Sequence, residues 1–181
     1  MNKPRIQPPR RIVTGHNDQG RSVIVWDGPA PTCLQPDHSP NVLMCDLWEI
    51  PTFPPDNSDP KDLSLRPVKL SPPETGAIFR IVEFPPDKQR NWAGRAQVFA
   101  QYGELHALDQ QNERHPGFHK TPSVDFAICL DGEIWAMMEE GETLMRPGDV
   151  LVQRGTNHAW ANRGDRPVRM AFVMIGAPAV N

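Results

Sequence analysis

The stretch from His115 to Glu133 reads HPGFHKTPSVDFAICLDGE, and its alternating side chains determine the fold class predicted for this chain. Successive side chains of a β-strand point to opposite faces. If the stretch is a strand, one face is wholly apolar and must be buried against something. The other face begins polar and ends small, as the wall of a lined cavity would. The apolar set is Val124, Phe126, Ile128 and Leu130, and the second set is His119, Thr121, Ser123, Asp125, Ala127 and Cys129.

A second stretch, GDVLVQRGTNHAWAN over residues 148–162, predicts a strand that runs into a glycine turn. His158 and Trp160 then emerge on one face. His119, Asp125 and His158 can converge on one metal ion from these two strands. Two imidazoles and one carboxylate form the facial set that leaves open positions on Fe(II), and they also suit Zn, Mn or Ni. Taken individually, each of the three is more simply an ordinary hydrogen-bonded residue.

Together the two stretches resemble the paired motifs of the cupin superfamily. His119-Lys120-Thr121 stands at the H-x-H positions, Asp125 at the glutamate and Gly132 at the closing glycine of the first motif. The second motif is matched by the G-x-x-H run that ends at His158 and by the final Asn162. The resemblance covers about residues 110–176 and is to small single-domain cupins of the type-2 kind. It implies a cupin-type β-barrel, also called a jelly roll or double-stranded β-helix.

The departures from these motifs bear on the metal. Thr121 replaces the second histidine, Asp125 replaces glutamate and Gln153 replaces the motif proline. The resemblance therefore implies a divalent metal ion (Fe, Zn, Mn or Ni) on His119, Asp125 and His158, with His115 near enough to be a fourth ligand. Asp125 is one methylene shorter than glutamate, so it can also act through water or orient His119. A ligand cavity without metal is the alternative.

Five residues are candidates for substrate binding. Thr121 lies on the polar face of the first stretch. Trp160 and Trp135 offer flat apolar surface for an aromatic or polyketide-like ligand, although core packing is the simpler explanation of each tryptophan. Gln153 and Arg154 can bind a carboxylate, since arginine presents a forked donor set, and a surface salt bridge is the alternative for Arg154.

The rest of the chain predicts an N-terminal extension. Residues 1–11 are basic and proline-containing and predict a flexible tail. Residues 12–108 predict a β extension with a proline-rich loop and one short helix, and residues 109–181 the barrel core. The β-branched runs at 11–14 and 22–26 predict a hairpin, 42–50 and 76–84 predict strands, 51–75 a loop, and 87–108 the helix.

Composition excludes several classes. The 21 prolines among 181 residues exclude a helical bundle. A net charge of −3 gives no field to recruit nucleic acid or a membrane surface, so neither is an expected partner. The three cysteines cannot all pair, which favours a reducing compartment, and no secretory signal or apolar span is present. We therefore expect a cytoplasmic protein.

These observations combine into one functional hypothesis. We expect a metal-dependent cupin enzyme, of the oxygenase or decarboxylase type, acting on a small organic molecule. The alternative is a non-catalytic cupin that binds a small molecule. A metal-free epimerase would need a tyrosine acid, and Tyr102, the one tyrosine, falls in the predicted helix. The outward apolar face around Phe126 predicts a homodimer.

Overall fold

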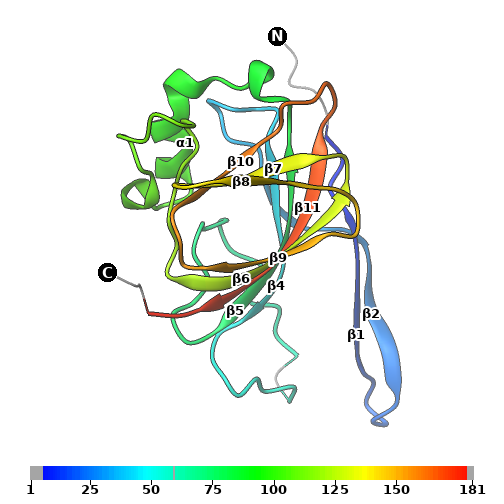
Figure 1. Cartoon of the computed structure of the whole chain (residues 1–181). Helices are drawn as coiled ribbons and strands as arrows, with labels where there is room; N and C mark the ends of the chain where they lie inside the picture. Colours follow the sequence, from blue (N-terminus) through cyan, green and yellow to red (C-terminus); the bar gives the residue numbers. More distant parts are fainter. Residues whose placement is uncertain (1–5, 59, 179–181) are drawn as a thin grey trace.

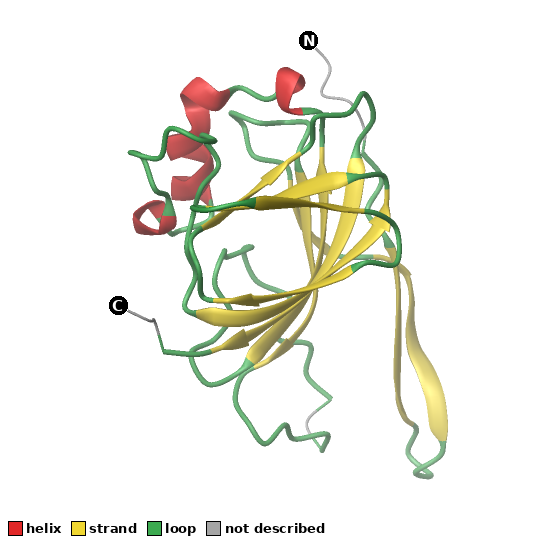
Figure 2. Ribbon diagram, in the orientation of Figure 1, coloured by secondary structure: helices red, strands yellow, loops and turns green. Residues whose placement is uncertain are grey.

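Most strands of this chain form two antiparallel sheets that face each other around a common interior (Figures 1 and 2). The computed structural model describes residues 6–58 and 60–178. The larger sheet has the order β3-β4-β5-β11-β6-β9 and the smaller one β10-β7-β8, which confirms the all-β prediction. The bounds are β3 Thr32–Leu34, β4 Leu43–Ile50, β5 Ala77–Phe84, β6 Ser123–Asp131, β7 Ile134–Met138, β8 Glu142–Met145, β9 Val150–Arg154, β10 His158–Ala161 and β11 Val168–Gly176.

Strand β6 alternates as the sequence predicts. Its polar and small side chains, Ser123 to Cys129 at every second position, are buried toward the interior. Within the single chain its apolar face is not fully covered, because Phe126 is 39% exposed and Leu130 is 44% exposed. Phe126 belongs to an apolar row that crosses four strands on the outside of the larger sheet. We call Phe79, Val173, Phe126 and Val152 the outer row.

The larger sheet takes strands from both halves of the chain. Strands β4 and β5 lie in the same sheet as β6, β9 and β11, and β5 pairs directly with β11. Residue 109 is therefore no boundary in the fold, and the predicted division between an extension at 12–108 and a barrel at 109–181 does not describe the sheet. The strands expected at 42–50 and 76–84 are present as β4 and β5.

A hairpin of β1 (Arg10–His16) and β2 (Ser22–Pro29) forms a separate two-stranded sheet that projects from the barrel (Figure 1). The sequence predicts this hairpin, but not that β1 begins inside the expected tail. Arg11 is buried, and its Nη1 donates to the carboxylate of Asp62 at 2.6 Å and to the carbonyl of Leu47 at 3.0 Å. Residues 1–5 of the predicted tail lie outside the described residues.

The single helix predicted over residues 87–108 is divided into short pieces. They are the 3-10 turns η1 Asp87–Gln89, η2 Trp92–Gly94 and η3 Leu105–Ala107, and the α-helix α1 Arg95–Gln101. Gly103 follows α1 with φ of 76°, a left-handed conformation that glycine adopts readily and that ends the helix. Helix α1 buries Val98 and Phe99 against the barrel interior.

The cysteines also differ from the prediction. Cys33 on β3 and Cys45 on β4 are directly opposite in the register and form a disulfide, while Cys129 is free and buried. An odd count leaves one cysteine unpaired but still allows one pair, so the cysteine count does not indicate a reducing compartment. Within residues 6–58 and 60–178, no helix has the length and apolar character needed to cross a membrane.

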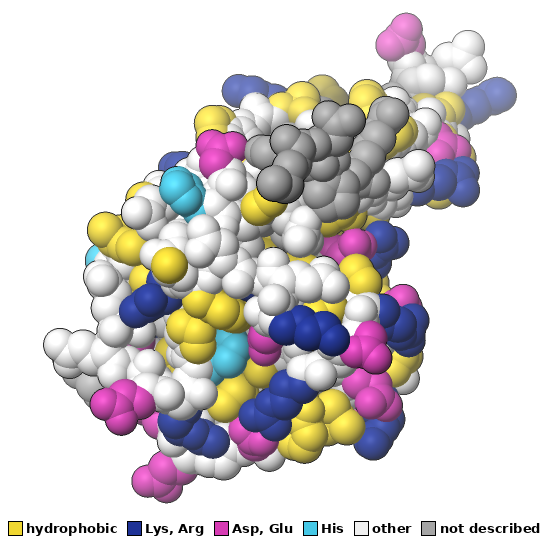
Figure 3. Space-filling model, turned by 90° about the horizontal axis from the view of Figure 1, so that it is seen from above, with side chains coloured by type: hydrophobic (Ala, Val, Ile, Leu, Met, Phe, Trp, Pro, Cys, Tyr) yellow, Lys and Arg dark blue, Asp and Glu magenta, His cyan; other side chains and the backbone are white. Residues whose placement is uncertain are grey.

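Charged side chains of both signs are mixed on the surface, as the view in Figure 3 shows. Several of them form exposed ion pairs, among them Arg163 with Glu142 at 2.7 Å and Lys88 with Asp165 at 3.1 Å. Exposed pairs of this kind contribute little to stability.

Candidate functional site

A small cavity lies between the two sheets, with a volume of about 80 Å³. We call it the histidine cavity. Its walls are mostly aromatic and aliphatic, and among the polar groups that line it are His119, Thr121, Asp125 and His158. The structure therefore brings four of the predicted polar site residues to one place, together with the predicted Trp160.

Backbone pairing holds the two histidines together. The His119 N–H donates to the His158 carbonyl at 2.8 Å, and the His158 N–H donates to the His119 carbonyl at 3.0 Å. Their ring centroids are 4.4 Å apart. Gly155 between β9 and β10 has φ of 60°, a left-handed turn that a residue with a side chain adopts less readily. This turn starts the strand that carries His158.

Both imidazoles have a defined tautomer. Nδ1 of His119 lies 2.9 Å from the carbonyl oxygen of Gly117, and Nδ1 of His158 lies 2.9 Å from that of Thr156. A carbonyl oxygen only accepts, so each Nδ1 carries the proton and each Nε2 keeps its lone pair. Burial lowers the pKa of His119, and burial with the nearby His119 lowers the pKa of His158 to about 3. Both rings are neutral at pH 7.

Asp125 is the carboxylate of this cavity. Only 4% of the residue is exposed, and burial raises its pKa to about 6 against the opposing effects of Ser123 and Arg80. Its Oδ1 is buried and accepts no hydrogen bond from the described residues. The neighbouring hydroxyls of Thr121 and Ser123 bond to each other at 2.9 Å.

The side chains of the histidine cavity fit the divalent metal that the sequence implies only in part. The two Nε2 atoms fit a divalent metal, because a metal-bound histidine usually donates its other ring N–H to a carbonyl or carboxylate. The predicted three-residue set is not assembled, since residues 6–58 and 60–178 contain no group of three His, Cys, Asp or Glu arranged to hold a metal ion. The two histidines therefore suit a metal ion, whereas Asp125 lines the same cavity without completing a three-residue metal site.

His115 is not a fourth ligand in this structure. It is absent from the walls of the histidine cavity, and both ring nitrogens have other partners. Nδ1 accepts the Gly117 N–H at 3.1 Å, and Nε2 lies 3.3 Å from the Asp87 carboxylate. Its ring stands edge-on to Trp92 with centroids 4.8 Å apart. The role of His115 is to hold the loop before His119.

The substrate-binding candidates are divided between different places. Trp160 lines the histidine cavity, edge-on to Phe172 at 5.4 Å between centroids. The prediction for Trp135 is wrong. Trp160 pairs with Ala136 in the β10–β7 register, so the adjacent Trp135 faces the opposite side, under Arg163 at 4.7 Å. Gln153 and Arg154 line a second cavity, described below.

Sequence reasoning missed four cavity residues from the segment around α1. Arg90, Val98, Phe99 and Tyr102 line the histidine cavity, and burial raises the pKa of Tyr102 to about 12, so its phenol stays protonated. Arg90 stacks on Trp92 at 3.9 Å, and burial lowers the pKa of its guanidinium. No motif marks these residues. Placing Tyr102 in a helix was no reason to keep it out of the site.

Comparison with known proteins agrees with this geometry. Residues 106–175 match the family model of the cupin domain. The chain contains a cupin domain. The match begins at η3 and ends in β11, so it includes both histidine-bearing stretches and omits β4 and β5. The cupin-type barrel expected from the sequence is thereby confirmed.

Relatives of this chain occur in fungi. Phomopsin biosynthesis cluster protein C' of Diaporthe leptostromiformis is 28% identical over 98% of this chain and 83% of its own length. The cupin-domain-containing oxidoreductase fogC of Aspergillus ruber is 39% identical over 32% of this chain and 30% of its own length. Among solved structures, the Schizosaccharomyces pombe Cnp3 cupin domain covers 92% of this chain and 86% of that one, with 11% identity and a TM-score of 0.43.

Proposed function

We propose that this chain is a cupin oxidoreductase that acts on a small, largely apolar organic molecule, with a divalent metal held by His119 and His158. The observation that carries the proposal is the pair of buried, neutral imidazoles whose Nδ1 protons are both fixed by backbone carbonyls. That arrangement leaves two Nε2 lone pairs in one apolar cavity, which is the donor chemistry that borderline metals such as Fe, Zn, Mn or Ni prefer.

The other groups in the cavity have separate roles in this proposal. A bound metal would supply Lewis-acid or redox chemistry. Trp160, Phe172 and Phe99 form the apolar walls that exclude water and hold the apolar body of the substrate. Asp125, with an unpartnered oxygen and a pKa raised to about 6, can hold or release a proton beside the substrate.

The relatives favour oxidation over decarboxylation. One of them is named a cupin-domain-containing oxidoreductase, and another belongs to a biosynthesis cluster. Of the two reaction types expected from the sequence, oxygenase and decarboxylase, we therefore favour the oxygenase. We expect its substrate to be an intermediate of a biosynthetic route.

Metal content tests the proposal. Protein purified without chelator should contain close to one transition-metal ion per chain by elemental analysis. His158→Ala removes one of the two nitrogen ligands and should lose most of that metal, by more than the roughly 10- to 100-fold seen when a supporting group is removed. His16→Ala makes the same substitution at an exposed position of the hairpin and should retain it.

Two outcomes would count against the metal. Wild-type protein without metal after growth in metal-supplemented medium would favour the alternative, a cupin that binds a small molecule without turnover. Metal retained in a folded His158→Ala variant would mean that the ion is bound elsewhere.

A further inference from the structure

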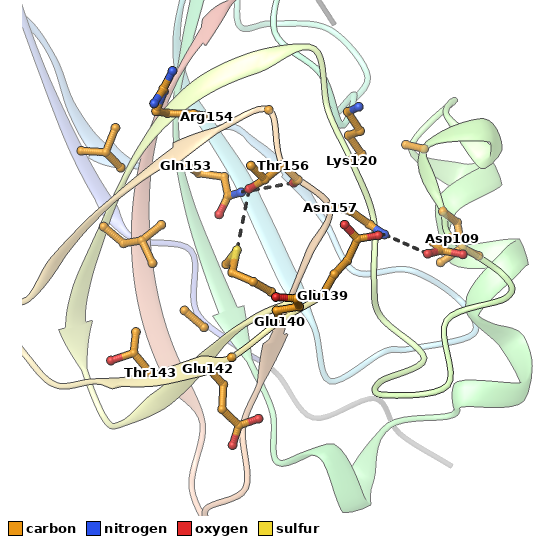
Figure 4. Close-up of a pocket in the computed structure, with 18 of the residues that line it drawn as sticks. Asp109, Lys120, Glu139, Glu140, Glu142, Thr143, Gln153, Arg154, Thr156 and Asn157 are labelled. Carbon is orange, nitrogen blue, oxygen red and sulfur yellow. Dashed lines mark hydrogen bonds between the residues drawn. The ribbon is translucent and has the colours of Figure 1, made fainter. Parts of the chain in front are cut away.

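A second cavity opens between β8 and β9, the edge strands of the two sheets. We call it the lateral cavity (Figure 4). Its volume is about 1110 Å³, against about 80 Å³ for the histidine cavity. Small organic ligands usually occupy pockets of about 300 to 1,000 Å³. The histidine cavity therefore admits only the reacting end of such a molecule, and the remainder needs a neighbouring space.

The strand register places the two cavities side by side. Asp125 lines the histidine cavity, and its partner across the β6–β9 pair, Gln153, lines the lateral cavity. In the smaller sheet, His158 lines the histidine cavity and its partner Met138 lines the lateral cavity. Directly opposed side chains have Cβ atoms about 5 Å apart. The same narrow boundary therefore separates the cavities in both sheets.

Side-chain contacts and one backbone carbonyl form this boundary. Gln153 Nε2 donates to the carbonyl of Thr156 at 3.2 Å and to its hydroxyl oxygen, and the Thr156 hydroxyl lies 3.7 Å from the sulfur of Met138 (Figure 4). The contacts connect β9 with β7 across the gap between the sheets. Because rotation of side chains can open them, a ligand in the lateral cavity can reach past them without movement of the backbone.

The side-chain oxygen of Gln153 accepts no hydrogen bond from the described residues. The residue is 2% exposed, and its Oε1 is buried. The Thr156 carbonyl can only accept, so the amide nitrogen must face it, and Oε1 must point the other way. Figure 4 shows the Gln153 side chain extending into the cavity, whereas Arg154 points away from it. Buried polar atoms are normally satisfied, so this oxygen is matched to a donor that a ligand brings.

We propose that the lateral cavity binds the larger part of the substrate, which carries its one polar group, and that Gln153 Oε1 accepts a hydrogen bond from that hydroxyl or N–H group. The apolar end then passes the boundary at Thr156 and Met138 to reach the histidines. Asn157 Oδ1, a second buried acceptor without a donor in this cavity, disfavours a carboxylate at the same place. The substrate class is therefore an apolar molecule that carries a neutral hydrogen-bond donor. This assignment names the substrate class of the proposed function. It rests on that function for the reaction, and on the two cavities for the binding.

A pair of probes tests the donor requirement. Para-butylphenol carries a hydroxyl donor on an apolar frame, and its methyl ether has the same frame without the donor. Nuclear magnetic resonance titrations of the full chain should show the phenol binding about fivefold more tightly than the ether, as expected for one neutral hydrogen bond. Gln153→Met should reduce the preference to less than twofold. Gln97→Met, the same substitution at an exposed position on α1, should leave it unchanged.

The wild-type titration also locates the probe, so the test survives if Gln153→Met fails to fold. The side-chain amide of Gln153 and the indole N–H of Trp160 should both shift, because one lies in each cavity. Equal affinity for phenol and ether, shifts in one cavity alone, or a preference that persists in Gln153→Met would overturn the proposal. The titration measures binding without metal or turnover, so its failure is distinct from failure of the metal test.

Discussion

The buried ion pair between Arg80 and Asp46 is expected to support one wall of the histidine cavity, and it gives the sharpest stability prediction. Arg80 on β5 lines that cavity, and its Nη2 lies 3.0 Å from Oδ1 of Asp46 on the neighbouring β4, without the alignment of a hydrogen bond. Their side chains are 2% and 0% exposed. Asp46→Ala removes a carboxylate that also pairs with Arg66 at 3.2 Å. It leaves the buried Arg80 guanidinium with the carbonyl oxygens of Leu70 and Lys69 but without its carboxylate. Breaking such a pair costs about 3–5 kcal/mol.

Because Arg80 keeps those two carbonyl partners, we place the loss in the free energy of unfolding at the lower end, about 3 kcal/mol. Urea denaturation followed by fluorescence measures it. Asp27→Ala breaks an exposed pair with Arg10 and should cost far less than Asp46→Ala. Adding Arg80→Met to Asp46→Ala should recover part of the loss, since the unpaired charge is then gone. A loss no larger than that of Asp27→Ala, or a double variant as unstable as the sum of the single ones, would refute the reasoning.

Two further predictions concern protonation and assembly. The folded pKa of Asp125, about 6, lies above its unfolded value of 3.8, so the carboxyl favours the folded state below pH 3.8 and progressively loses that contribution as pH rises to 6. Asp125→Asn should therefore gain stability relative to wild type between pH 4 and pH 7, by up to about 3 kcal/mol in urea titrations, and a flat difference would contradict the burial argument. The outer row, exposed at Phe126 and Val152, predicts a dimer. Light scattering should give twice the mass of one chain, reduced by Phe126→Lys, and a monomer for wild type would show that a second copy does not cover this face.

The fold was predictable where side-chain alternation is strict. The residues of β6 alternate between a polar or small side chain and an apolar one. This period of two fits a strand and not a helix, so the pattern identified the inner and the outer face of β6. The helix at 87–108 failed for a local reason, since Gly94 and Gly103 interrupt an apolar spacing that otherwise suits a helix. The sheet membership of β4 and β5 depends on pairing with β11, some ninety residues away, which the local pattern around residues 43–84 does not encode.

The site residues were predictable where a sequence motif determines the path of the backbone that carries them. The spacing that resembles cupin motifs placed His119 and His158 correctly, because backbone hydrogen bonds join these two residues directly in an isolated bridge. Trp135 was assigned to the wrong face because a one-residue shift along β7 exchanges inside for outside. Arg90 and Tyr102 reach the cavity from an irregular segment whose path over the barrel depends on tertiary packing. The disulfide was missed because counting cysteines says nothing about which two lie opposite.

The position of β11 in the middle of the larger sheet has a consequence for synthesis. This strand, at residues 168–176, lies between β5 and β6, so neither neighbour can complete its hydrogen bonding until residues 168–176 have left the ribosome. Contacts between such distant segments form slowly, and unpaired strand edges invite association with other chains in the meantime. A growing chain would therefore display the edge of β5 while the rest is translated. Slow refolding and a need for chaperones during expression follow from where the last strand is inserted, independently of the chemistry in the cavity.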